Sequence, residues 1–267
     1  MTQQELVAPA AEATNTQPAP NAVPETVCAL CQQLAVLKSS HIIPNSYFKQ
    51  MKQGGKLVRF DLQEHTAVTT GQDSWQEKLL CEPCEGRFSK LETRWIGKLR
   101  KADSLFAAGP YVVNFPDFEF DSFKTFLLSI LWRAAVSSHE RLSEVMLTPH
   151  DREQLRAALL GGSTAQLKEW SIEIRKIIDR LGILELEPLI LAPMNRSEPG
   201  QLVYRFVFGG YLVDFKFRPK TVGRSALRDV SVFQLQSIAM ADVPEVMHVG
   251  LIAIDKGNRG LDRRVKQ

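Results

Sequence analysis

The chain has 267 residues, of which 44% are hydrophobic, and it carries a formal net charge of +3. This composition is ordinary for a globular protein, and the length leaves room for a small metal module and one larger domain. No apolar run reaches the length needed to span a bilayer, so we expect no membrane partner. The mild positive charge permits nucleic-acid binding without requiring it, because solvated Lys and Arg explain it equally well.

Residues 1–26 predict a disordered acidic tail. They are rich in Ala, Pro, Thr and Gln and contain three Glu but no Lys or Arg, so the rest of the chain carries a formal charge of +6. Such a segment cannot bury enough apolar surface to order itself. It also lacks the basic and apolar regions of a signal peptide, and we therefore expect a cytoplasmic protein.

The four cysteines of the chain form two CxxC pairs, Cys28 with Cys31 and Cys81 with Cys84. Each pair can present two thiolates from one knuckle, and two knuckles supply the four soft ligands of a tetrahedral zinc site. The alternatives are two disulfides or four buried thiols. Paired CxxC spacing favours the metal, and we expect all four cysteines to bind a structural Zn²⁺.

The surroundings of the cysteines predict how this module is built. Residues 56–62 alternate loosely and predict a strand after a turn at Gly54-Gly55. After the second pair, Pro83 suits the first turn of a helix. Apolar residues then recur at helical spacing, at Phe88, Leu91, Trp95 and Leu99. A knuckle, a hairpin and a helix that carries the last ligands form a treble-clef zinc finger, and we assign residues 27–101 to it.

His41 lies between the two cysteine pairs, in the run Ser-His-Ile-Ile-Pro. One interpretation is a histidine that packs on the zinc site or bonds to the backbone. The other is a general base, a role that histidine fills more often than any other side chain. The residues alone leave both interpretations open.

Residues 102–267 predict an α+β domain in which helices accompany an antiparallel sheet. The first helix has Asp121 as its cap and a continuous apolar stripe. Arg133 in this helix could meet a phosphate or serve as a structural ion-pair partner. A second helix begins at Thr148-Pro149 and ends at Gly161-Gly162.

The remaining segments of this domain are one ambiguous stretch, a hairpin and a last strand. Residues 170–181 fit a strand or a helix, and the pattern does not decide between them. Residues 201–217 predict a hairpin that turns at Gly209-Gly210 and places Arg205 opposite Asp214. Residues 247–254 predict a last buried strand. The basic C-terminus that follows could add phosphate contacts or be a solvated end.

A CxxC pair, a His-Ile-Ile-Pro element and a second CxxC pair at a helix start are similar to the zinc-bearing branch of the HNH endonucleases. Four segments extend the likeness: SHIIPNSYFK, LLCEPCEGRFSKLE, LLSILWRA and SEVMLTPHDREQLRAALL. They resemble in particular a bacterial family of HNH-like proteins, and the likeness covers roughly residues 28–215. The resemblance implies a ββα-metal active site that hydrolyses DNA. By analogy with the family, the biological setting would be phage or plasmid restriction.

The resemblance also implies roles for particular residues. In these nucleases a histidine deprotonates the attacking water, and a hydrated divalent cation stabilises charge on the phosphate. Carried onto this chain, His41 is the general base and Glu85 is a ligand for Mg²⁺ or Mn²⁺. The metal ligand expected directly before the base is replaced by Ser40. The orienting asparagine of the family is missing, and Gln76 or Glu77 stands nearest to its place.

Two functions of different classes follow. The first is a metal-dependent nuclease that uses His41 and Glu85. Glu92 could share the metal with Glu85 only with difficulty, because seven residues along a helix separate their backbones by about 10 Å. The second is a catalytically inactive, zinc-stabilised module that binds nucleic acid or protein, which Ser40 in place of a metal ligand favours.

Overall fold

The computed structural model describes residues 25–51, 57–60, 68–71, 74–109, 111–182, 184–197, 199–218, 226–228 and 230–251. Three predicted features lie outside these residues: the acidic tail up to residue 24, the turn at Gly54-Gly55 and the basic C-terminus. Among the described residues, no helix is both long and apolar enough to cross a membrane.

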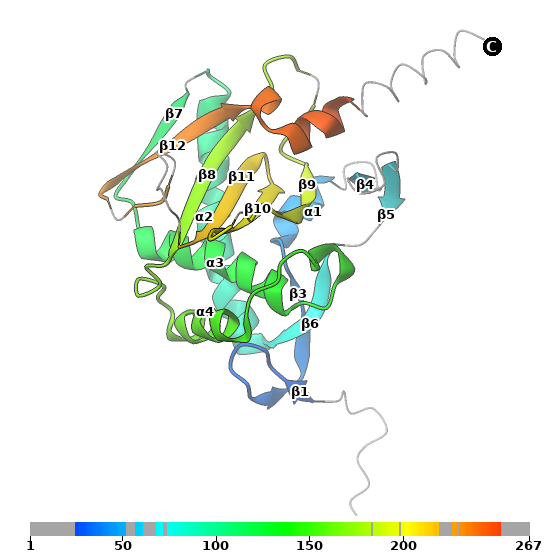
Figure 1. Ribbon diagram of the computed structural model, residues 1–267, viewed down its shortest axis with the longest axis vertical. Helices are drawn as coiled ribbons and strands as arrows, with labels where there is room; N and C mark the ends of the chain where they lie inside the picture. Colours follow the sequence, from blue (N-terminus) through cyan, green and yellow to red (C-terminus); the bar gives the residue numbers. More distant parts are fainter. Residues whose placement is uncertain are drawn as a thin grey trace, which may run out of the picture.

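The N-terminal part consists of short antiparallel strand pairs and two helices (Figure 1). Strand β1 (Thr26–Val27) pairs with β2 (Leu34–Ala35), β3 (Leu37–His41) with β6 (Gln76–Cys81), and β4 (Leu57–Phe60) with β5 (Val68–Gly71). Helix α1 (Asn45–Met51) follows β3. The predicted strand over 56–62 is therefore present as β4. The treble-clef topology itself stays a prediction.

Helix α2 (Glu82–Phe106) begins at the second cysteine pair, as the sequence predicts. Cys81 is its N-cap residue and a proline lies in its first turn. Its apolar face is buried, through Cys84, Phe88, Trp95, Ile96, Leu99, Ala102 and Phe106. The helix continues past residue 101 without a break, so the division of the chain at this position also stays a prediction.

The rest of the chain is built on a six-stranded sheet. Its strands are β7 (Val112–Pro116), β8 (Trp170–Ile178), β9 (Ile190–Asn195), β10 (Leu202–Phe208), β11 (Tyr211–Phe217) and β12 (Val232–Ala239), in the order β7-β12-β8-β11-β10-β9. Strand β12 runs parallel to β8 and the other pairs are antiparallel. The sheet is thus mixed and not antiparallel as predicted, because β12 lies on the other side of β8 from β11 and runs parallel to β8.

The predicted hairpin is confirmed in every pair. Strands β10 and β11 meet with Phe208 opposite Tyr211 and Arg205 opposite Asp214. Strand β8 then pairs with the whole length of β11, through its residues Trp170 to Lys176. The segment over 170–181, which the sequence left open, is therefore a strand up to Ile178 because the exposed edge of the hairpin supplies its hydrogen-bond partners.

Helices α3 (Phe120–Val136) and α4 (Pro149–Gly161) match the two predicted helices. Thr148 Oγ1 accepts a hydrogen bond from the Asp151 N–H, and Gly162 ends α4 in the left-handed region with φ of 82°. Asp121, however, is not the cap of α3. Glu119 occupies that position, and the Asp121 carboxylate instead accepts from the Thr164 N–H at 2.8 Å.

Helices α2 and α3 lie against one face of the sheet (Figure 1). The aromatic side of the hairpin packs there, with Tyr204, Phe206 and Phe215 fully buried. Hydrogen bonds also connect the sheet to α2. The Tyr211 hydroxyl of β11 lies within hydrogen-bond distance of the Leu99 carbonyl, at 3.0 Å, and of Asp103 Oδ1, at 2.6 Å. One hydrophobic core therefore runs from the cysteine module into the sheet.

The other face of the sheet is covered at one end by a short helix over 244–251. This finding corrects the predicted buried strand over 247–254. Val243, Val246 and Val249 recur every three residues and pack onto Leu212 and the apolar residues around it. That spacing places them on one side of a helix, and a short apolar run alone cannot distinguish this arrangement from a strand.

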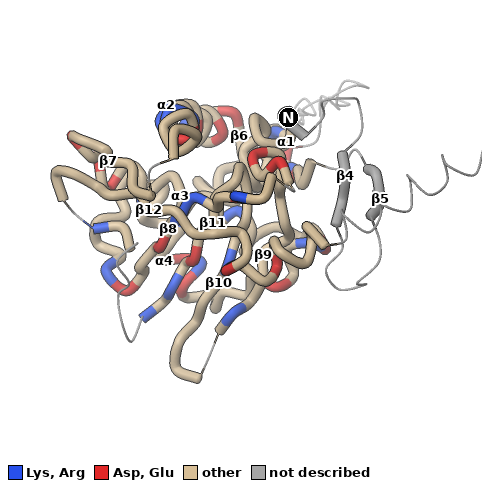
Figure 2. The backbone as a smooth tube through the Cα atoms, turned by 90° about the horizontal axis from the view of Figure 1, so that it is seen from above, with Lys and Arg blue, Asp and Glu red and all other residues tan. Residues whose placement is uncertain are grey.

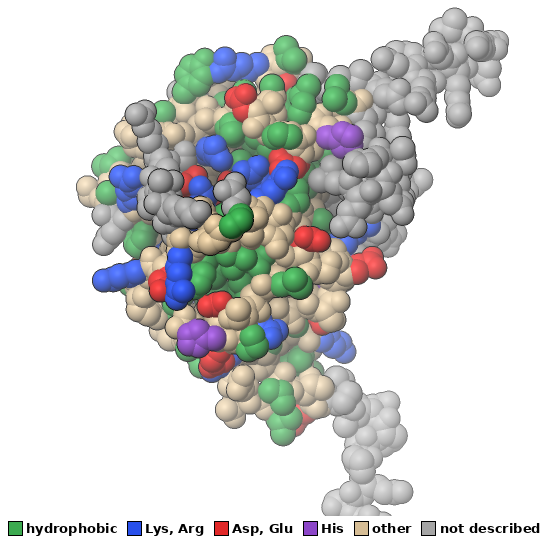
Figure 3. Space-filling model, in the orientation of Figure 1, with side chains coloured by type: hydrophobic (Ala, Val, Ile, Leu, Met, Phe, Trp, Pro, Cys, Tyr) green, Lys and Arg blue, Asp and Glu red, His purple; other side chains and the backbone are tan. Residues whose placement is uncertain are grey.

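The uncovered part of this face carries charges of both signs (Figures 2 and 3). Arg205 bonds to Asp214 through two nitrogens at 2.8 and 3.0 Å, and Lys216 lies 2.8 Å from Glu173. Arg196 makes a further ion pair, with Glu245. Because the acidic partners Glu173, Asp214 and Glu245 are buried, these basic side chains are neutralised locally and do not form a surface of a single sign.

Candidate metal cluster and adjoining polar site

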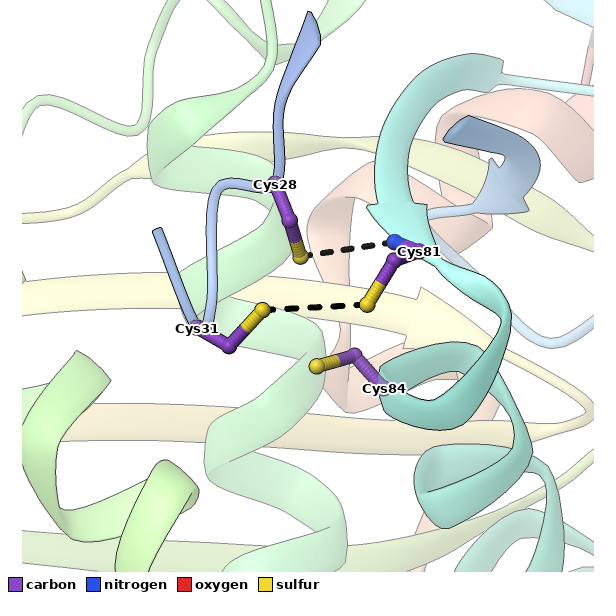
Figure 4. Close-up of side chains that lie close together, drawn as sticks. All are labelled: Cys28, Cys31, Cys81 and Cys84. Carbon is purple, nitrogen blue, oxygen red and sulfur yellow. Dashed lines mark hydrogen bonds between the residues drawn. The ribbon is translucent and has the colours of Figure 1, made fainter. Parts of the chain in front are cut away.

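The two cysteine pairs are brought together by the ends of four elements. Cys28 and Cys31 lie in the turn between β1 and β2, whereas Cys81 ends β6 and Cys84 lies in the first turn of α2. Their four Sγ atoms all lie within 4.8 Å of one another. Figure 4 shows the four side chains pointing toward a common centre.

The geometry of this cluster fits a tetrahedral zinc ion and not a disulfide. All four cysteines are free, and the Sγ atoms of Cys31 and Cys81 are 3.7 Å apart. A disulfide requires about 2.05 Å. Four ligands at the Zn–S distance of about 2.3 Å place neighbouring sulfurs about 3.8 Å apart. The cluster is therefore consistent with the predicted structural Zn²⁺, held by all four cysteines.

The electrostatics of the cluster differ from one thiol to the next. Burial raises the pKa of Cys28, but the N–H groups of Cys31, Cys81 and Leu30 outweigh it and lower the pKa to about 7. The Cys81 N–H donates to Cys28 Sγ at 3.3 Å. Burial and the neighbouring thiols hold the pKa of Cys84 above its ordinary value. Four thiolates at this spacing would repel one another, and a bound divalent cation removes this obstacle.

Next to the cluster, β3 brings Ser40 against the start of α2. Ser40 is fully buried, and its hydroxyl donates to Glu85 Oε2 at 2.6 Å. Glu85 directly follows Cys84, and the register of β3 against β6 places Ser40 opposite Glu77. The two positions at which the resemblance implies metal ligands are thus in direct contact, although 45 residues separate them.

His41 ends β3 directly after Ser40. Its Nε2 lies 3.4 Å from Ser74 Oγ, and its ring centroid lies 6.4 Å from that of Phe48. The side chain is half-buried. The imidazole therefore lies close to a hydroxyl and an aromatic ring, and its role as a general base stays a prediction.

Arg133 holds this part of β3 in place from inside the protein. Its side chain is only 1% exposed, and its guanidinium donates to the His41 carbonyl at 2.5 Å and to Glu92 Oε1 at 2.7 Å. It also lies 5.4 Å from the centre of the Phe88 ring. Of the two predicted roles for Arg133, the structure shows the structural ion pair, and Glu92 is its acidic partner.

The residues considered for the missing asparagine have other contacts. Gln76 pairs with His41 in the β-ladder, and its side chain is exposed. Glu77 accepts from the hydroxyls of Ser137 and Ser138 at 2.6 and 2.7 Å. Burial opposes the ionisation of Glu77, but these bonds outweigh it and lower the pKa. Ser74 is the residue closest to the imidazole in these contacts, and sequence reasoning missed it because a serine outside any motif gives no signal.

No family model, no curated protein and no solved structure matches this chain. The likeness to HNH endonucleases therefore rests on the sequence motifs alone.

Proposed function

We propose that this protein is an HNH-like, metal-dependent endonuclease that hydrolyses DNA phosphodiester bonds. The observation that supports this proposal best is the contact between Ser40 and Glu85, next to His41 and the four-cysteine cluster. The two candidate ligand positions are in contact where β3 ends and α2 begins, and this contact supports a shared metal site there.

In this proposal each residue of the polar site has a separate role in the hydrolysis. His41 takes a proton from the attacking water, and the Ser74 hydroxyl, 3.4 Å from Nε2, orients the imidazole. Glu85 supplies a hard carboxylate ligand for Mg²⁺ or Mn²⁺, which would stabilise charge on the phosphate and the leaving oxygen. Arg133 positions His41 through its backbone carbonyl. The zinc cluster has a structural role, because four cysteines leave no open position for substrate.

The test is a plasmid-nicking assay with Mg²⁺ or Mn²⁺ on the zinc-loaded protein. We expect cleavage by the wild type and a loss of at least about a hundredfold in His41→Ala, the range that a general base contributes. His150→Ala is the matched control, since His150 lies exposed at the start of α4, outside the site. No cleavage by the wild type at high protein concentration would contradict the nuclease.

A second candidate function is a zinc-stabilised module that binds nucleic acid or protein without turnover. The observation that favours it is again specific: the Glu85 carboxylate already has a short hydrogen bond from Ser40, where an active site would have a second metal ligand. This candidate predicts that His41→Ala keeps both its fold and its biological effect. Loss of the effect in a folded His41→Ala protein would exclude it.

A further inference from the structure

A cleft of about 640 Å³ lies at the N-terminal end of α3, away from the cysteine cluster. Residues of the first turns of α3, the segment before β8 and the Leu227-Arg228 segment line it, among them Phe120, Lys124, Lys168 and Trp170. Its volume lies within the range of about 300–1,000 Å³ that is typical of small-molecule sites. Lys124 and Arg133 are nine residues apart in the sequence, which places the cleft about 13 Å along α3 from the contact with His41.

Lys124 brings a buried positive charge to this cleft. The residue is 4% exposed, and its Nζ donates to the Leu167 carbonyl at 2.6 Å. No carboxylate of the described residues forms an ion pair with it. Burial lowers the pKa of Lys124 to about 8, although the nearby Asp121 acts in the opposite direction. A buried ammonium with a single neutral acceptor is costly, and a bound anion would supply the missing partner.

Trp170 adds a buried donor that has no acceptor among the described residues. It is 3% exposed, and its Nε1–H has no hydrogen-bond partner within the described part of the chain. Buried indole N–H groups usually find a partner. Because this group can only donate, the partner that it lacks must be an acceptor, as it is for Lys124.

The N-terminus of α3 is a third feature that favours a negatively charged ligand in this cleft. No side chain of the described residues caps this 17-residue helix, and Glu119, Phe120, Asp121 and Ser122 all line the cleft. The Phe120 N–H already donates to the Phe118 carbonyl at 3.1 Å, which leaves the N–H groups of Asp121 and Ser122 in the first turn for a ligand. The positive end of the helix dipole also favours an anion at such a position.

The two carboxylates at this end of the helix are already engaged. Glu119 accepts from Lys98 at 3.3 Å and from Arg94, and Asp121 accepts from Thr164. At the mouth of the cleft, Lys168 and Arg228 add exposed positive charges. Among the described residues, the charges of the lining that have no ionic partner are therefore positive, on Lys124, Lys168 and Arg228.

We propose that this cleft binds a small organic phosphate of mononucleotide size. The phosphate group lies among Lys124, the Trp170 Nε1–H and the N–H groups of Asp121 and Ser122 in the first turn of α3. The organic part lies against Phe120 and Leu227, which supply the apolar wall. This site is independent of the proposed nuclease activity, because none of its residues belongs to the polar site at His41.

Isothermal titration calorimetry on the zinc-loaded full chain tests the proposal with three probes: adenosine monophosphate, adenosine and inorganic phosphate. We expect one molecule of adenosine monophosphate per chain. We also expect binding at least about tenfold weaker for adenosine, because the charge-assisted bonds are lost. Absence of binding by adenosine monophosphate at millimolar concentration would overturn the site. Equal affinity for inorganic phosphate would overturn the role given to the organic part.

Variants locate the binding. Lys124→Met keeps the length of the side chain without its charge, and Trp170→Phe keeps a ring without the N–H. Both should weaken the binding of adenosine monophosphate at least several-fold, whereas Lys90→Met on the exposed side of α2 should leave it unchanged. Unaltered affinity in folded Lys124→Met would overturn the proposal. If that variant does not fold, the exposed Arg228→Met takes its place and the same criterion applies.

Discussion

Ser40, which directly precedes His41, donates a 2.6 Å hydrogen bond through its hydroxyl to Oε2 of Glu85, which directly follows Cys84. This bond connects the end of β3 to the start of α2. Because of this short distance, a carboxylate at position 40 in place of the hydroxyl would lie directly against the Glu85 carboxylate. This relationship makes the proposed metal site testable by restoring the ligand that the chain lacks.

Ser40→Asp should lower the free energy of unfolding by about 1–3 kcal/mol without added metal, because a carboxylate at this buried position lies against the half-buried Glu85 carboxylate and the two repel each other. Mn²⁺ or Mg²⁺ should restore this stability, since it binds both groups. Thermal unfolding of the zinc-loaded protein, with and without Mn²⁺, measures the effect. Ser40→Asn is the uncharged control. A midpoint for Ser40→Asp that does not respond to Mn²⁺ would show that the pair cannot hold a metal.

Removal of zinc should abolish the cooperative unfolding of the N-terminal part. Structural zinc sites contribute folding free energy directly, and apparent binding energies of about 10–16 kcal/mol are known for small zinc modules. Elemental analysis should find one zinc per chain in the wild type and none in Cys84→Ser. Loss of tertiary signal in near-ultraviolet circular dichroism should accompany chelation. A metal-free protein with the same unfolding curve as the wild type would rule out a structural zinc.

Arg133→Met should cost about 3–5 kcal/mol of unfolding free energy, because it leaves Glu92 without its partner and the His41 carbonyl without its donor. Urea unfolding measures the cost. The double variant Arg133→Met, Glu92→Gln should recover part of it, since the unpaired carboxylate is then gone. Independent, additive effects of the two changes would mean that the ion pair contributes nothing.

Two glycines provide a matched pair for backbone and steric effects. A Cβ atom on Gly209, which has φ of +60°, would lie 2.2 Å from Tyr47 Cε1. Gly209→Ala should therefore cost more than about 1 kcal/mol, as an incompatible backbone position does. A Cβ on Gly97, inside α2, would meet nothing within 4 Å. Gly97→Ala should stabilise the protein by up to about 1 kcal/mol, and opposite signs of the two changes in urea unfolding check the prediction.

The stability of the protein should depend on Lys124 at alkaline pH. Burial lowers the pKa of this lysine to about 8 in the folded protein, from the ordinary lysine value of 10.5. The unfolded chain therefore binds more protons between these values, and stability rises with pH. Between pH 8 and 10 the unfolding free energy of the wild type should increase by about 1–2 kcal/mol relative to Lys124→Met. A constant difference between the two proteins over this range would contradict a depressed pKa.

Several elements were predictable because local interactions determine them. Thr148, Pro149 and Gly162 define both ends of α4 within one stretch of chain. The hairpin register follows from the two-residue turn at Gly209-Gly210. The predicted last strand over 247–254 was wrong, because its short apolar run contains no local signal that distinguishes a strand from a helix.

The sequence by itself determined the cysteine pairs, the helix that carries the second pair, the hairpin and α4, because spacing, caps and turns act over a few residues. Only the tertiary structure decided which residues meet across long separations: Ser40 with Glu85, Arg133 with His41, and Lys124 with the cleft beside Trp170. It also decided that β12 runs parallel to β8 and that residues 170–178 form a strand. These outcomes depend on packing and hydrogen bonds between distant segments, which no local pattern records.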